Sequence, residues 1–332
     1  MSRTTFLSPR FHYTFGPHVP TLTIASGAAL RIVCPDSDNA LADGTVLSPE
    51  QRHRGDGAAP FEGNPVAGPI AVERAADGDC LAIRIETIEL DRSWGQTLLS
   101  PGHGLLPGHL LIPDQAEQPE KAIPRHMYRW EIDGSAGVAH VANPLGAAPV
   151  AVKLDPFIGC IGVCPKWSQA ISTMYAGPHG GNMDLPAVRP GATFYLPVYH
   201  AGGLLMLGDL HAAQGAGEII GGAIETSGKV DCSITLMRKR RLPAPRLIDG
   251  TRIMAMGCDG ELRAAVQQAY AHLLDWIADD LGFNRWDAYN LISQTGSVAI
   301  GGLLAPPYVV GAAVPLAALP ETVLRRIESW RA

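Results

Sequence analysis

A short polar segment, residues 207–218, holds the residue types from which hydrolytic sites are built. It places Asp209, His211, Gln214 and Glu218 close together, with only small or aliphatic residues between them. On a strand, residues two apart point to the same face, so Asp209 and His211 would suit a divalent metal or an acid-oriented base. A polar hairpin rim, in which His211 only hydrogen-bonds an acid, has the same spacing. Local sequence leaves both interpretations open.

A glycine-rich turn provides a second group of candidate residues. Gly180 and Gly181 directly precede Asn182 and Asp184. Glycine lets a ligand or metal approach the backbone closely, and an amide side chain offers both a donor and an acceptor. The turn is therefore predicted to bind a metal or a substrate amide, although an ordinary Asx-type turn would use the same residues.

Two further segments contribute weaker candidates. Asp38 lies in an Asp-Ser-Asp-Asn run after a predicted strand, where it could ligate a hard cation or cap a turn. His103 lies within 94–125, which is rich in proline, glycine and histidine and which we interpret as a long loop lining a pocket.

The elements that must position these residues are predicted to be mostly strands. The 37 glycines and 27 prolines punctuate many short apolar runs, a pattern typical of β-rich proteins. Helices are expected over 260–280 and 285–293, followed by an extended apolar tail at 303–314. Strands are predicted at 30–33, 80–86, 203–210, 218–226 and 230–236. The loop 212–217 would then bring Glu218 back beside Asp209 and His211.

The proline-rich segment 241–245 is the best candidate for a boundary in this chain of 332 residues. We expect an N-terminal β-rich part at 1–150, a central β part carrying the site motifs at 151–240, and a small α/β part at 241–332. These three parts are expected to form one compact unit.

Composition excludes several classes of protein. The net charge of -6 argues against a nucleic-acid partner, which would need a basic face. No apolar segment is long enough to span a bilayer, and the first residues lack an apolar signal core, so we predict no membrane partner and a cytoplasmic location. Serine-hydrolase elbows, His-Glu-x-x-His zinc helices and phosphate-binding Walker loops are all missing.

The segment 207–218 closely resembles the GDxHAAQGDGE signature of the acetamidase/formamidase family of amide hydrolases. Other motifs similar to that family's follow in the family order at 68–75 (GPIAVERA), 101–106 (PGHGLL), 157–165 (FIGCIGVCP), 179–184 (HGGNMD), 194–198 (FYLPV) and 286–293 (WDAYNLIS). The resemblance implies an α+β, β-rich fold with a β-sandwich or barrel body and a smaller C-terminal α/β portion. It also implies a homo-oligomer, either a dimer or a tetramer.

The resemblance implies hydrolysis of a small amide to a carboxylate and ammonia or an amine. Our hypothesis gives the proton transfers to Glu218 as general base and then acid, with His211 also catalytic. A divalent metal, for which zinc is the first choice, would activate the water. Its expected ligands are Asp38, Asp184, Asp209 and His211, and the expected substrate contacts are His103, Gly181, Asn182 and Gln214.

One position departs from the family pattern. Ala216 stands where the signature usually has an aspartate between two glycines, which suggests an altered substrate, larger than acetamide or cyclic. Two other interpretations stay open: a metal-free cysteine amidase using Cys160 or Cys164, and a non-catalytic relative that only binds a ligand. The four retained polar residues Asp184, Asp209, His211 and Glu218 argue against the second.

Overall fold

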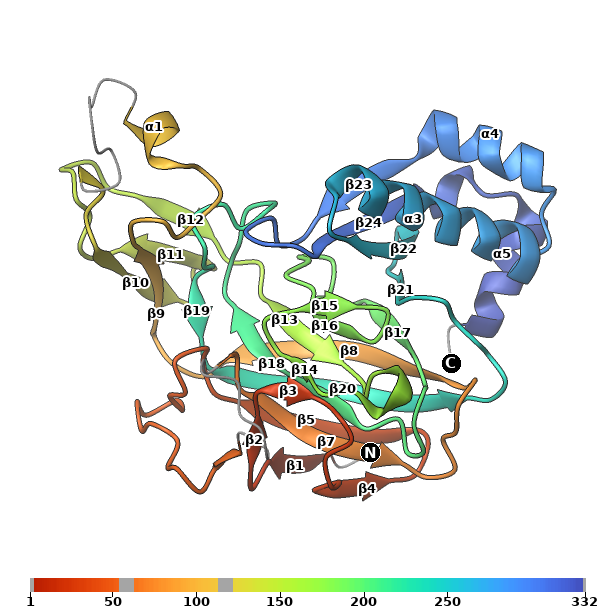
Figure 1. Cartoon of the computed structure of the whole chain (residues 1–332), viewed down its shortest axis with the longest axis horizontal. Helices are drawn as coiled ribbons and strands as arrows, with labels where there is room; N and C mark the ends of the chain where they lie inside the picture. Colours follow the sequence, from red (N-terminus) through yellow and green to blue (C-terminus); the bar gives the residue numbers. More distant parts are fainter. Residues whose placement is uncertain (1–2, 54–62, 113–121, 331–332) are drawn as a thin grey trace.

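The computed structural model describes residues 3–53, 63–112 and 122–330. Two large sheets make up the body, the C-terminal helices gather at one end, and a four-stranded antiparallel extension, β9 to β12, projects at the other (Figure 1). The predicted β-rich α+β fold is confirmed. The barrel alternative was wrong, because neither sheet closes on itself among the described strands.

The first sheet joins strands from the two ends of the chain. Its nine strands, in spatial order, are β1 (Thr4–Leu7), β5 (Ala28–Cys34), β20 (Gly228–Met237), β8 (Cys80–Leu90), β17 (Thr193–Pro197), β21 (Arg246–Ile248), β22 (Arg252–Asp259), β24 (Tyr308–Pro315) and β23 (Ser297–Ile300). The C-terminal strands therefore continue the sheet that β5, β8 and β20 begin, through the pairing of β17 with β21.

The second sheet carries the candidate site near its middle. Its main path runs through β12 (Ala151–Lys153), β11 (Val138–Val141), β10 (His126–Asp133), β9 (Trp94–Leu99), β19 (Glu225–Thr226), β18 (Leu205–His211), β13 (Phe157–Gly162), β16 (Gly180–Asn182) and β15 (Ala176–Gly177). On a side branch lie β7 (Val66–Val72), β2 (Phe11–His12), β4 (Leu22–Ile24) and β6 (Arg52–His53). A separate pair joins β3 (Thr14–Phe15) to β14 (Ile171–Ser172).

The main core lies between the two sheets. It includes Ile83 and Ile234 from the first sheet and Ile158, Leu207 and Leu210 from the second, all fully buried. Each such aliphatic side chain contributes about 1.5–3 kcal/mol by leaving water. Every residue of β18 is buried, so this strand provides a rigid support for the polar residues at its end.

A second core lies under the helices, where Trp276 and Trp330 are buried against Tyr195. The helical segments are α1 (Gly108–Leu111), η1 (Lys166–Ser168), α3 (Leu262–Asp275), η2 (Trp276–Asp280), α4 (Arg285–Thr295), η3 (Leu316–Ala318), α5 (Glu321–Ile327) and η4 (Glu328–Trp330). The two predicted helices thus exist. Within the described ranges, no helix is long and apolar enough to cross a bilayer.

Two expectations about the site region were wrong. The segment 94–125 is not all loop, because its start forms β9, which pairs with β10 and β19. Glu218 does not lie on a strand, because the strand in this region covers only Glu225–Thr226. Gly217 and Gly221 have φ angles of +85° and +98°, and such left-handed backbone turns the chain out of an extended path.

Candidate active site

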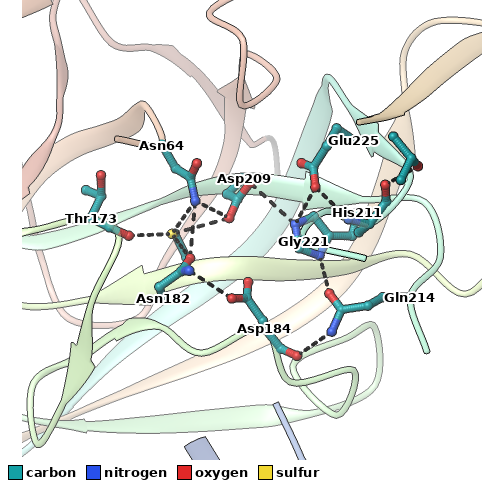
Figure 2. Close-up of polar contacts among 12 residues, drawn as sticks. Asn64, Thr173, Asn182, Asp184, Asp209, His211, Gln214, Gly221 and Glu225 are labelled. Atoms are coloured by element: carbon teal, nitrogen blue, oxygen red, sulfur yellow. Dashed lines mark hydrogen bonds and ion pairs between the residues drawn. The ribbon is translucent and has the colours of Figure 1, made fainter. Parts of the chain in front are cut away.

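The end of β18 brings Asp209 and His211 together. Nε2 of His211 lies 3.4 Å from Oδ1 of Asp209 and 3.4 Å from Oε1 of Glu225 (Figure 2). The His211 ring stands edge-on to Phe157 of β13, with the ring centroids 4.9 Å apart. An imidazole between two carboxylates is therefore fixed on a buried, apolar support.

Gln214 fixes the orientation of the His211 ring. Its Oε1 accepts a hydrogen bond of 2.8 Å from Nδ1 of His211, and its Nε2 donates one of 2.8 Å to the backbone oxygen of Asp184. Because an amide oxygen only accepts, Nδ1 carries a proton and Nε2 is left to face Asp209 and Glu225. Both ends of the Gln214 amide, expected to orient a substrate, are engaged within the protein.

Asp184 and Glu218 form a buried carboxyl pair. Their side chains are hydrogen-bonded to each other, and both residues are less than a tenth exposed. Burial, followed by the charge of Glu218, raises the pKa of Asp184 well above its ordinary value. Burial also raises the pKa of Glu218. Two acids this close hold a proton that one of them would lose in water.

Asn182 connects this carboxyl pair to Asp209. Its Nδ2 donates to Oδ2 of Asp184 at 2.8 Å, and its Oδ1 accepts from Asn64 at 3.2 Å and from the Cys160 thiol at 2.7 Å. Nδ2 of Asn64 also donates to Oδ2 of Asp209 at 2.7 Å. Figure 2 shows this network spanning from Thr173 to Gln214. Asn182 therefore holds Asp184 directly and is connected to Asp209 through Asn64.

Three site carboxylates share an uncommon backbone conformation. Asp184, Asp209 and Glu218 have φ angles of +43°, +60° and +51°, a region that non-glycine residues rarely adopt. Each such residue costs on the order of 1–3 kcal/mol and persists only where its surroundings hold it. Strain concentrated on three converging acids is typical of a functional site.

The side chains of Asp209 and His211 pack closely against Gly159 of β13. A Cβ atom there would come within 2.7 Å of Oδ2 of Asp209 and 2.9 Å of Cε1 of His211. Real Cβ atoms do not approach so closely, so the acid and the imidazole lie directly against the β13 backbone. Any larger residue at position 159 would displace both groups.

Glu225 and Asn64 belong to the site and were missed from sequence. Burial raises the pKa of Glu225 to about 8. Burial lowers the pKa of His211, but the charges of Glu225 and Asp209 outweigh it and leave the pKa well above the ordinary value. The one available signal for Glu225 was an acid directly after the apolar pair Ala223 and Ile224. Asn64 carried no local signal.

Other predicted residues lie at or beyond the margin of this cluster. Asp38 accepts a hydrogen bond from Gln96 and lies outside the groups of converging ligand atoms found among the described residues. Nε2 of His103 lies 2.7 Å from the backbone oxygen of Gly221. Gly181 lies in β16, where a Cβ would meet the Tyr175 oxygen at 2.3 Å.

The donor atoms fit a divalent metal ion. Among the described residues, Asp184, His211 and Glu218 offer ligand atoms within 4.8 Å of one another, and Asp209, His211 and Glu225 do the same. Oε2 of Glu225 is buried without a hydrogen-bond partner. Buried acceptors of this kind are costly unless a cation or water satisfies them. Imidazole nitrogen and carboxylate oxygen are donors that zinc accepts.

His179 is buried and directly precedes Gly180 and Gly181, but it lies outside the cluster. It leads to a prediction about the stability of the protein in acid. Its ring packs edge-on against Phe15, and burial lowers its pKa to about 4. Between pH 6.5 and 4 the His179 imidazole binds a proton in the unfolded chain but not in the folded chain. The free energy of unfolding therefore falls as pH falls. This group alone should remove about 3 kcal/mol from the free energy of unfolding over that range.

The measurement is urea unfolding of the wild type and His179→Gln at several pH values. The difference in unfolding free energy between the two proteins should change across pH 6.5 to 4 in favour of the variant. If the unfolding free energies of the two proteins change in parallel with pH over this range, His179 is not a neutral, buried group.

Comparison with solved structures identifies the family. An acetamidase crystal structure from Yersinia enterocolitica is 31% identical in sequence, has a TM-score of 0.79, and aligns over 97% of this chain and 94% of its own. The chain belongs to the acetamidase/formamidase family. A predicted acetamidase/formamidase from Thermoanaerobacter tengcongensis is 25% identical, with a TM-score of 0.80 over 98% of this chain and all of its own.

The sequence comparisons agree with this assignment. Residues 167–320 match the model of the Acetamidase/Formamidase family. The formamidase of Methylophilus methylotrophus is 28% identical over 222 residues, which is 52% of this chain and 51% of that protein. The chain thus spans about half the length of this curated relative. The matched residues 167–320 include Asp184, Asp209, His211 and Glu218.

Proposed function

We propose that this protein hydrolyses the carbon–nitrogen bond of an amide, releasing a carboxylate and ammonia or an amine. The observation that carries the proposal is the convergence of the Asp184–Glu218 carboxyl pair with His211 in one buried cluster. Family membership supports the same reaction. We also propose that the enzyme is cytoplasmic and forms a homo-oligomer. Light scattering of the purified protein would test the oligomeric state.

Asp209, His211 and Glu225 would hold a divalent ion, with zinc as the first choice. When bound, such an ion polarises the amide carbonyl and lowers the pKa of a water molecule. The chain contributes the fixed orientation of its ligands: Gln214 sets the His211 ring, and Asn64 holds Asp209. Outer contacts of this kind usually change metal affinity by about 10- to 100-fold when they are lost.

This division of roles leaves Glu218 free to move protons. As a carboxylate it accepts a proton from the attacking water, and as an acid it returns that proton to the leaving nitrogen. Burial raises its pKa above the ordinary value of a glutamate, which favours the protonated form that the second step needs. Asp184 shares the proton with Glu218, and Asn182 holds Asp184 in place.

Ammonia release from formamide and acetamide tests the proposal directly. The purified protein should release ammonia, lose this activity after removal of divalent metal, and regain it when zinc is added back. Full turnover by protein shown to be metal-free would rule out the metal, while leaving amide hydrolysis intact. If neither ammonia nor an amine is released from any amide tested, with zinc present, the proposed reaction is rejected.

The cysteine alternative makes a different prediction. Cys160 is fully buried, its thiol donates to Asn182, and burial holds its pKa well above the ordinary value. A nucleophilic thiol needs a base or a positive field beside it, and the Cys160 thiol faces Asp209 instead. Cys160→Ala should keep kcat within about tenfold of the wild type, since cavity effects at one thiol are small. Loss of 1000-fold or more, on a folded protein, would revive the cysteine mechanism.

A further inference from the structure

A large apolar pocket opens beside the catalytic cluster. Its volume is about 830 Å³, which is within the range of pockets that enclose drug-sized ligands, roughly 300–1,000 Å³. Acetamide and formamide would fill a small part of it. The walls come from the extension β9 to β12 and from the loop that follows β18, and they include Tyr128, Trp130, Val141, Val152, Ile219 and Ile224.

The pocket is continuous with the candidate active site. Gln214, which orients His211, and Glu218, the proposed proton carrier, both line it. A group bound in the pocket would therefore be attached to an amide whose reacting atoms lie beside Glu218. A substituent at this place contributes to the transition state as well as to binding.

Hydrogen bonds hold the wall in place. Nε1 of Trp130 donates to Oγ1 of Thr97 at 3.1 Å, and the Thr97 hydroxyl donates in turn to the backbone oxygen of Ala223. This chain links β10 and β9 to the loop between β18 and β19. The Trp130 side chain is thus fixed in the pocket wall before any ligand arrives, which lowers the entropic cost of ordering it on binding.

The charges around the pocket favour an uncharged group. Apart from Glu218, its charged lining residues are Lys153 and Asp155, which are exposed, and Asp155 is paired with Arg189 at 2.6 Å. The remaining wall is mainly aliphatic and aromatic. Burying an ionised group against it would cost several kcal/mol of desolvation, whereas an apolar group gains by leaving water.

We propose that this pocket binds a bulky apolar substituent of the substrate, so that the preferred amide carries an aromatic or branched aliphatic group. The inference rests on the proposed amide hydrolysis and narrows its substrate class. Each buried methylene of a substrate is worth about 10- to 200-fold in kcat/KM. An apolar group of six or more carbons should therefore raise kcat/KM at least tenfold over acetamide.

The experiment compares acetamide with phenylacetamide, which has an apolar acyl group, and with N-benzylformamide, which has an apolar amine. We expect one of the two larger amides to exceed acetamide in kcat/KM by tenfold or more, and the better one identifies the end of the substrate that enters the pocket. In Val152→Trp, which fills the pocket, the ratio of this kcat/KM to that for acetamide should fall at least tenfold. Ala151→Trp, the adjacent exposed residue of β12 outside the pocket lining, is the matched control and should keep the ratio.

The outcomes separate the two proposals. Hydrolysis of acetamide with no preference for either larger amide would overturn the pocket inference and leave amide hydrolysis standing. If no amide is hydrolysed, calorimetric binding of phenylacetamide decides: binding that Val152→Trp weakens tenfold supports the pocket, and no binding to the wild type overturns it. If Val152→Trp fails to fold, Ala216→Asp is the second test variant. It adds a charge to the pocket wall and should lower the ratio of kcat/KM for the larger amide to kcat/KM for acetamide.

Discussion

Glu218→Gln should lower kcat for amide hydrolysis by about 10²- to 10⁴-fold, the usual contribution of a positioned acid or base. Glutamine has the size of glutamate and keeps a hydrogen bond to Asp184, but it cannot carry the proton. Substrate binding should change much less than kcat. The measurement is steady-state kinetics on the best amide, together with thermal unfolding to show that the variant is folded.

A surface carboxylate provides the control for this prediction. Glu89 on β8 is about half exposed and pairs with Lys229 and Arg31. Glu89→Gln removes the same kind of charge at the surface, outside both groups of ligand atoms. It should leave kcat within twofold, because exposed ion pairs contribute about 0–1 kcal/mol. Near wild-type turnover in Glu218→Gln would move the proton transfers to another residue. Asp184 would then be the first candidate, because it shares a hydrogen bond with Glu218.

His211→Ala should have the second large effect. His211 belongs to both groups of converging ligands, so its loss should weaken metal binding by at least about 100-fold, more than the loss of a supporting contact. Activity should fall with metal content. Removing the imidazole also leaves Asp209 and Glu225 buried without their shared partner, which costs on the order of 3–5 kcal/mol of stability.

Metal content per chain, measured after dialysis, separates these effects. His179→Gln is the matched control, because it replaces another buried histidine that belongs to neither ligand group. It should keep its metal. A His211→Ala protein that still binds metal stoichiometrically and turns over would remove His211 from the site.

Much of the site could be predicted from local spacing. Strand alternation predicts that Asp209 and His211 lie together, and their side chains do lie 3.4 Å apart. The strand predictions at 80–86 and 230–236 fall within β8 and β20. These features depend on residues near one another in the chain, where periodicity carries information.

The rest depends on contacts between distant segments. Glu225 joins His211 because β19 pairs with both β18 and β9, and no local pattern signals that pairing. Asn64 reaches Asp209 across 145 positions of sequence. The strand at 94–99 was hidden in a proline- and glycine-rich segment, and the left-handed backbone of Asp184, Asp209 and Glu218 has no compositional signature.

The loop that carries Glu218 is held from the far end of the chain. The backbone of Gly217 bridges to Gly302, with the Leu303 amide donating to the Gly217 oxygen at 3.1 Å, and Gly302 lies against Oδ2 of Asp184. During synthesis, Asp209 and His211 are added to the chain about ninety residues before Gly302, so the contact between Gly217 and Gly302 cannot form until later. The carboxyl pair therefore gains this backbone support only after all of the site residues have been synthesised.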